Sequence, residues 1–261
     1  MLRIARIDNL SARPYTLVAP AFPADVMPCT PSEVYSRAVT GMCDAALLPV
    51  ARLRELQDRY EPFGPYGIAA HGPAYSVRVF SRTRLESAVT SGRPVYLTPK
   101  SQTSRELFAL LCRRDFGCEP VTTIHAEEAA ARLLIGDEAL DTSREELTWS
   151  HQCDLGQWWF DRSRLPFVFA RWIVRRDLSG DERDLLRRWL EETTALAESP
   201  DGMRCLAEAG IPGVDAAEAE SAARRYFSSI HARLTLADLH GLSAFLRLQE
   251  EREHDLWVKS A

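Results

Sequence analysis

Short apolar runs alternate with helical patterns in the first half of the chain. Several runs rich in Val, Ile, Leu and Ala have the length and composition of buried strands. The predicted strands are Leu2–Ile7, Ala45–Leu48, Ile68–Ala70 with Ser76–Phe80, Val95–Thr98, Val121–Ile124 and Arg132–Ile135. Helices are predicted to begin after Thr30 and after Ser101, and a third, alanine-rich helix is predicted over Ala126–Ala131. This alternation is typical of an α/β fold.

The pattern from Ser179 onward predicts helices only. Three pairs of residues have the three-residue spacing of a helix capping box: Ser179 with Glu182, Asp215 with Glu218, and Thr235 with Asp238. Just before this region, Leu165–Val174 is the most hydrophobic stretch of the chain. A strand that is covered on both faces has this composition, so we expect it to cross back between two lobes.

These patterns predict a helical C-terminal third, and the length allows one large domain or two lobes. In the division into two lobes, residues 1–86 form the first part of lobe 1 and residues 87–167 form lobe 2. Residues 168–261 then return to lobe 1 and add the C-terminal helices.

The composition of the chain argues against nucleic acid, membranes and metal ions as partners. The 261 residues are 46% hydrophobic and 26% charged, as in an ordinary globular protein. The net charge of −5 argues against a nucleic-acid partner, because such surfaces are strongly basic. No apolar stretch has the length of a signal peptide or a membrane-spanning helix, so we expect a cytoplasmic protein without membrane contact. The six cysteines and six histidines lack the spacing of metal ligands, and no metal is expected.

A turn rich in hydroxyl groups joins the strand at Val95–Thr98 to the helix that follows. Ser101, Thr103 and Ser104 lie where free backbone N–H groups and the positive end of the helix dipole coincide. Such a point binds a carboxylate or a phosphate. Alternatively, one of these hydroxyls simply caps the helix. A cap requires one hydroxyl, whereas three are present here.

Two further polar residues lie at strand ends. Ser76 follows the turn His71–Tyr75, so its side chain is expected to face the space between the lobes. No Gly-x-Ser-x-Gly motif surrounds it, which argues against a hydrolase nucleophile, and a hydrogen bond to nearby backbone is the alternative. Asp137 follows Gly136 after a buried strand, and either contacts a ligand hydroxyl or caps the next short helix.

An ordered set of segments carries a resemblance to a known family. The segments are Arg6–Pro14, His71–Val77 with Phe80–Arg82, Leu97–Pro99 with Thr103–Ser104, Leu134–Leu140, Asp154–Gly156 with Trp159, and Leu165–Trp172. Over nearly its full length the chain resembles the chorismate dehydratases of the futalosine route to menaquinone. A sister family, the cyclase acting on dehypoxanthinyl futalosine, carries His-Glu where this chain has Gly136 and Asp137, and is therefore disfavoured.

The resemblance implies a fold similar to type II periplasmic binding proteins, with two lobes around a cleft. It also implies a lyase that dehydrates chorismate, a small-molecule dicarboxylate, to 3-[(1-carboxyvinyl)oxy]benzoate without a cofactor. The protein would be a monomer or a homodimer. By the same resemblance, Ser76 and Ser11 are candidate catalytic residues, and the candidate substrate-binding residues are Thr103, Ser104, Asp137, Ser101 and Asn9.

Two positions depart from the family pattern. Family members usually carry Tyr-Leu-Asn where this chain has Asn9, Leu10 and Ser11, and a serine is common where Val50 stands. An amide and a serine hydroxyl offer different donors, and valine offers none. These changes favour an alternative class, a non-catalytic binding protein or divergent paralogue for a small aromatic or enol carboxylate. The retained residues Ser76, Thr103, Ser104 and Asp137 favour the lyase.

Overall fold

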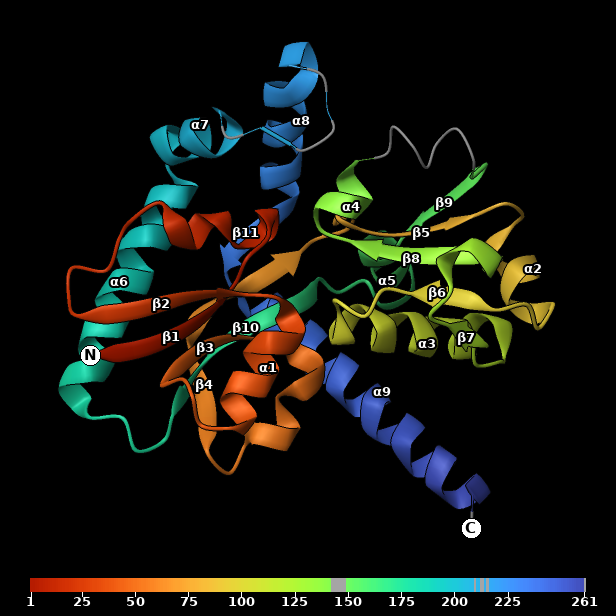
Figure 1. Cartoon of the computed structure of the whole chain (residues 1–261), viewed down its shortest axis with the longest axis horizontal. Helices are drawn as coiled ribbons and strands as arrows, with labels where there is room; N and C mark the ends of the chain where they lie inside the picture. Colours follow the sequence, from red (N-terminus) through yellow and green to blue (C-terminus); the bar gives the residue numbers. More distant parts are fainter. Residues whose placement is uncertain (142–148, 209, 212–213, 215, 261) are drawn as a thin grey trace.

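The chain folds around two mixed β-sheets that lie side by side (Figure 1). The computed structural model describes residues 1–141, 149–208, 210–211, 214 and 216–260. The six-stranded sheet has the order β11-β4-β10-β3-β1-β2, and the five-stranded sheet has the order β7-β6-β8-β5-β9. The strands are β1 (Leu2–Ile7), β2 (Ala24–Cys29), β3 (Ala45–Pro49), β4 (Tyr60–Ala70), β5 (Val77–Ser81), β6 (Val95–Leu97), β7 (Thr122–Thr123), β8 (Ala131–Ile135), β9 (His151–Asp154), β10 (Phe167–Arg175) and β11 (Ile230–Arg233).

Helices cover both sheets. In Figure 1, α6 lies beside the first sheet, α3 runs along the second, and the long helix α9 extends away from the body toward the C-terminus. The α-helices are α1 (Pro31–Val39), α2 (Leu85–Thr90), α3 (Gln102–Phe116), α4 (Asp137–Leu140), α5 (Leu155–Ser163), α6 (Gly180–Glu198), α7 (Pro200–Glu208), α8 (Ala216–Ser229) and α9 (Leu236–Ser260). Short 3₁₀ helices are η1 (Leu10–Thr16), η2 (Val50–Arg52), η3 (Arg54–Leu56) and η4 (Ala126–Glu128).

Strand β10 connects the two hydrophobic cores. It pairs antiparallel with β3 on one side and with β4 on the other. Phe167 and Val168 at its start pack into the core that extends under the five-stranded sheet. Trp172 and Val174 pack into the core of the six-stranded sheet. The hydrophobic stretch predicted as a crossing strand therefore has this role, because both faces of β10 are covered.

Local signals for helix starts are confirmed. Thr30 and Glu33 form a complete capping box at α1, and Ser101 is the N-cap of α3. Ser179 caps α6 in the same way. Thr235 and Asp238 also exchange the two bonds of a capping box at the start of α9, whereas Asp215 lies outside the described residues.

Two predictions were wrong. Residues 126–131 do not form a helix: a 3₁₀ turn ends at Glu128, and Ala131 already pairs with Ser81 and Val95 in the sheet. Burial between two strands outweighs the helix propensity of alanine. The C-terminal third is also not purely helical, because β11 adds an edge strand antiparallel to β4.

The strand pairing bears on where the lobes divide. The expected boundary after residue 86 assigns β5 to the first lobe, whereas β5 pairs with β8 and β9 of the five-stranded sheet. We propose that the first division falls between β4 and β5, in residues 71–76.

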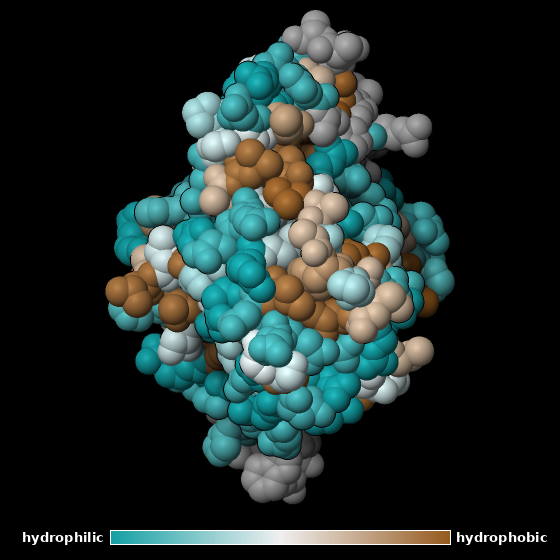
Figure 2. Space-filling view, turned by 90° about the vertical axis from the view of Figure 1, so that its left-hand side faces the viewer, coloured by the Kyte–Doolittle hydropathy of each residue, from teal (hydrophilic) through white to brown (hydrophobic). Residues whose placement is uncertain are grey.

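The surface shows no dominant apolar area from the side drawn in Figure 2. There, hydrophobic groups are interrupted by hydrophilic side chains. Exposed hydrophobic residues of this scattered kind are normal in globular proteins. Among the helices that the structure describes, none combines the length and the apolar character needed to cross a bilayer.

Close packing between β4 and β10 yields a stability prediction. A Cβ at Gly67 would lie 2.4 Å from the carbonyl oxygen of Ala170, which belongs to the backbone and cannot swing away. We expect Gly67→Ala to lower the free energy of unfolding by about 1–3 kcal/mol, measured by urea denaturation. Gly180→Ala is the control, because a Cβ there meets no atom within 4 Å. Equal stability of the two variants would contradict this packing.

Candidate functional site

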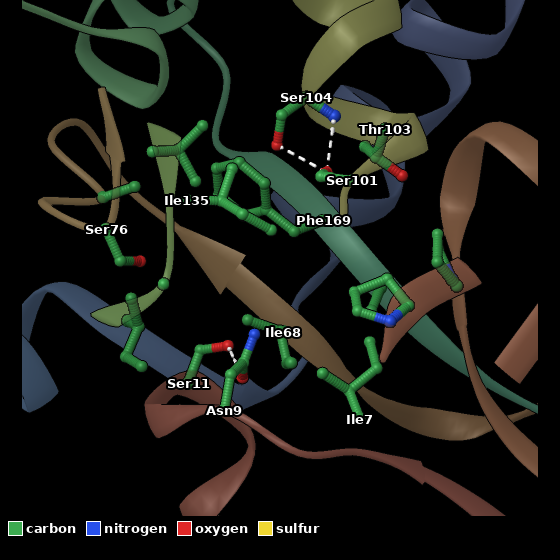
Figure 3. Close-up of a pocket in the computed structure, with 17 residues that line it drawn as sticks. Ile7, Asn9, Ser11, Ile68, Ser76, Ser101, Thr103, Ser104, Ile135 and Phe169 are labelled. Carbon is green, nitrogen blue, oxygen red and sulfur yellow. Dashed lines mark hydrogen bonds between the residues drawn. The ribbon is translucent and has the colours of Figure 1, made fainter. Parts of the chain in front are cut away.

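A cavity lies where the two sheets meet (Figure 3). The carboxyl ends of β1 and β3, the start of β5 and the N-terminus of α3 contribute to its wall, together with parts of β4, β8 and β10. Ligands in α/β folds commonly bind beside the carboxyl ends of strands. The space measures about 530 Å³ with its mouth, but the free volume inside is only about 50 Å³. The walls therefore stand close together in this conformation.

The N-terminus of α3 forms one wall with three buried hydroxyl groups. Ser101 Oγ accepts a hydrogen bond from the backbone N–H of Ser104 at 3.1 Å and donates to Ser104 Oγ at 2.8 Å. Thr103 Oγ1 accepts from the backbone N–H of Ala51 at 3.3 Å. Ser101 thus caps the helix, while the hydroxyl hydrogens of Thr103 and Ser104 remain available to a ligand.

Asn9 and Ser11 lie on another wall and are joined to each other. Ser11 Oγ donates to Asn9 Oδ1 at 2.7 Å, and the backbone N–H of Ala12 donates to the same oxygen at 3.2 Å. These two donors identify the amide oxygen, so the amide NH₂ is free to serve the cavity. Ser11 stands where family members usually carry an asparagine. An amide donor is still present beside it, because Asn9 lines the cavity.

Ser76 faces the cavity from the start of β5, apart from the α3 wall (Figure 3). Its hydroxyl oxygen accepts a hydrogen bond from the phenol of Tyr226 at 3.2 Å, and its backbone carbonyl accepts from Gly136 N at 2.7 Å. Burial raises the pKa of Tyr226, against the opposing effect of hydrogen bonds to Ser76 and Ser11, so the phenol stays protonated. No pattern in the sequence indicated Tyr226, because it lies 150 residues from Ser76.

Asp154 shapes the turn that leads to Ser76. Its carboxylate accepts hydrogen bonds from the backbone N–H groups of Ala74 at 3.0 Å and Tyr75 at 2.6 Å. It also caps α5 by accepting from Gln157 N at 3.1 Å. Tyr75 has φ +57°, a conformation that costs free energy in a residue with a side chain. Burial raises the pKa of Asp154, although its backbone hydrogen bonds act in the opposite direction.

Two positions singled out in the sequence lie elsewhere. Asp137 is not on the cavity wall; it lines a neighbouring pocket with Arg6 and Arg13. Nor does it cap α4, because Gly136 occupies the N-cap with φ +59° and Asp137 is the first helical residue. Val50 is fully buried in the hydrophobic core rather than on the wall.

The wall of the cavity consists of neutral polar groups and apolar side chains. Between the polar groups lie Ile68, Ile135 and Phe169, so the centre of the cavity is apolar (Figure 3). No described residue lining it carries an ionisable side chain. Across the described part of the chain, no group of three His, Cys, Asp or Glu residues is placed to hold a metal ion. The cavity therefore offers neutral hydrogen-bond donors around an apolar centre.

Solved structures that superpose on this chain identify its class of fold. A protein from Archaeoglobus fulgidus, AF1704, superposes with a TM-score of 0.67 over 97% of each chain at 15% identity. The CA3427 gene product of Candida albicans, described as having the generic periplasmic binding protein fold, superposes at 0.62 over 96% of this chain and 90% of that one, with 8% identity. The chain therefore has a periplasmic-binding-protein-like fold.

Comparison with the sequences of known proteins identifies the family as well as the fold. The model of a family described as "Menaquinone biosynthesis" matches residues 2–251, and the chain belongs to this family. A chorismate dehydratase of Thermus thermophilus is 27% identical over 203 residues, which cover 63% of this chain and 71% of that protein.

The contacts of Asp154 give the second prediction. Asp154→Ala would leave the backbone N–H groups of the buried Ala74 and of Tyr75 without this acceptor, so we expect a loss of about 2 kcal/mol in the free energy of unfolding. Asp184→Ala is the matched control, because Asp184 forms only an exposed ion pair with Arg187, and its removal should change stability by less than about 0.5 kcal/mol. Urea denaturation measures both. A loss in Asp154→Ala no larger than in the control would contradict the assigned role.

Proposed function

We propose that this protein dehydrates chorismate to 3-[(1-carboxyvinyl)oxy]benzoate. The observation that carries the proposal is the cavity in this member of the menaquinone biosynthesis family: neutral donors on separate walls, an apolar centre, and no ionisable side chain among the described residues that line it. The similarity to the chorismate dehydratase of Thermus thermophilus supports the same substrate.

The reaction requires little from a protein base. Chorismate carries two carboxylates, a ring hydroxyl, and a neighbouring ring C–H that is acidified through the conjugated ring carboxylate. Loss of this proton and of the hydroxide yields one water and an aromatic ring, so the reaction is strongly downhill. The enzyme then contributes mainly positioning and stabilisation of negative charge. The side-chain carboxylate of the substrate can take the proton, which fits a cavity with no histidine or glutamate among its described lining residues.

The walls suggest a division of roles. Thr103, Ser104 and the N-terminus of α3 would bind one carboxylate and stabilise the dienolate that develops when the proton leaves. Ser76 would donate a hydrogen bond near the reacting carbon atoms. Ser11 would support the NH₂ group of Asn9, which donates to the substrate from the other wall.

The narrow cavity implies that the walls move. A free volume of about 50 Å³ holds only a few water molecules. Chorismate is larger, so the two sheets would separate to admit it and close again around it. Closure would exclude water and strengthen the hydrogen bonds to the developing charge.

A binding protein without catalysis is the second candidate. The fold it shares with periplasmic binding proteins and the serine at position 11 favour it. Incubation of the purified protein with chorismate, followed by chromatography for the aromatic enol ether, separates the two. Product formed faster than in a protein-free control supports the lyase. Thermal stabilisation by chorismate without product supports the binding protein, and neither effect would refute both.

The same assay tests Ser76. Ser76→Ala removes one donor near the reacting centre, so turnover should fall by about 10- to 1000-fold. Ser81→Ala is the control, because Ser81 is a buried serine at the end of β5, the strand that Ser76 precedes, and its hydroxyl donates to the Thr83 carbonyl away from the cavity. An unchanged rate in Ser76→Ala would remove this residue from the mechanism.

The absence of ionisable groups from the described cavity wall predicts the pH dependence. Burial raises the pKa of Tyr226 above its ordinary value, so this phenol does not titrate in the neutral range. We therefore expect kcat to be constant between about pH 6 and pH 9. A profile with a histidine-like limb near pH 6.5 would contradict substrate-assisted proton transfer.

A further inference from the structure

The phenol of Tyr226 is hydrogen-bonded to a serine of the cavity. Tyr226 lies on α8, is only 1% exposed, and packs edge-on against Phe227 with ring centroids 5.1 Å apart. Its hydroxyl donates to Ser76 Oγ at 3.2 Å. The ring itself belongs to the hydrophobic core rather than to the cavity wall.

Other buried phenols in the chain behave differently. Tyr15, also 1% exposed, donates to the backbone carbonyls of Gly67 at 2.7 Å and Ala232 at 2.9 Å. Tyr60 donates to the backbone carbonyl of Cys43 at 2.7 Å. Backbone carbonyls are enough to satisfy a buried hydroxyl. The hydrogen-bond partner of Tyr226 is instead the side chain of Ser76, which lines the cavity.

The direction of the hydrogen bonds has a chemical consequence. A serine hydroxyl has one hydrogen to donate and lone pairs to accept. Because the phenol fills an acceptor position on Ser76 Oγ, the hydrogen of Ser76 is left for another acceptor. Ser76 lies on the cavity wall, so that acceptor can be a ligand.

The bond also joins the two halves of the fold. Helix α8 packs against β11 at the edge of the six-stranded sheet. Ser76 belongs to the other half, since it immediately precedes β5 and its carbonyl accepts from Gly136, which follows β8. The hydrogen bond between Tyr226 and Ser76 therefore links α8 to the segment that leads into the five-stranded sheet.

We propose that Tyr226 is a positioning residue for the dehydration of chorismate: its phenol holds the hydroxyl of Ser76 so that the serine donates its hydrogen bond to the substrate. The inference rests on the function proposed above. It adds a residue of α8 that touches no substrate and acts through Ser76.

Tyr226→Phe removes the phenol oxygen and retains the ring, so the core packing is preserved. We expect kcat for chorismate to fall about 10-fold while KM changes less than about twofold, because the loss of one orienting hydrogen bond of about 1.4 kcal/mol acts on the transition state. Tyr15→Phe is the matched control. It removes a phenol oxygen of equal burial that contacts only backbone carbonyls, and kcat should be unchanged.

A double mutant separates positioning from a general structural role. In the Ser76→Ala background, Tyr226→Phe should have no further effect on kcat, because the residue through which it acts is gone. An equal fall in both backgrounds would overturn the inference, and so would an unchanged kcat in the single variant. Failure of the wild-type protein to convert chorismate would instead refute the proposed function, and the inference with it.

The contact itself has a direct signature. In protein with ¹³C at Cζ of tyrosine, the resonance of Tyr226 is the one that disappears in Tyr226→Phe. Ser76→Ala should shift this resonance and leave that of Tyr15 in place. A Tyr226 resonance that does not respond to Ser76→Ala would show that the phenol is not bonded to Ser76, and the inference would fail without any measurement of activity.

Discussion

The pairing of β10 with β3 and β4 is the constraint on which the rest of the structure depends. This strand arrives from the five-stranded half of the fold and completes the six-stranded sheet. Its side chains enter both hydrophobic cores, and Phe169 and Ala170 between them reach the cavity. The same buried strand therefore holds the two halves together and forms the apolar floor of the site. Burial on both faces explains why so hydrophobic a segment is needed there.

A second layer of residues sets the direction of the donors in the cavity. Asp154 accepts the backbone N–H groups of the turn before Ser76, and Asn9 is oriented by the bonds that its oxygen accepts. On the α3 wall, Ser101 uses its hydroxyl on the helix start and on Ser104. Each polar group at the wall is held by a bond on its far side, so little reorganisation is needed when negative charge appears.

The lack of ionisable side chains among the described lining residues is consistent with this arrangement. A charged group buried without a partner is costly, whereas neutral hydroxyl and amide groups cost less to keep beside an apolar space. Neutral donors in a closed apolar space still stabilise an anion strongly, because water does not screen them. A reaction whose substrate carries its own base needs no more than that.

Part of this architecture is determined by the sequence alone. The α/β class, the starts of α1 and α3 and the hydrophobic strand β10 follow from periodicity and from capping residues, which act over a few neighbouring positions. The cluster of hydroxyls at α3 was visible for the same reason. The position of Ser76 at the start of a strand singled it out, whereas only the resemblance to a known family supplied Ser11, which no local pattern distinguishes from an ordinary serine.

The tertiary structure decided what depends on distant contacts. Residues 126–131 do not form a helix, because Ala131 pairs with neighbouring strands in the sheet. Strand β11 forms because it pairs with the edge of β4. Asp137 lies on a neighbouring pocket, whereas Asn9 lines the cavity beside Ser11. The link from Tyr226 to Ser76 spans 150 residues of chain. Such a bond leaves no periodic trace in the sequence, since it arises only when the folded backbone brings the two side chains together.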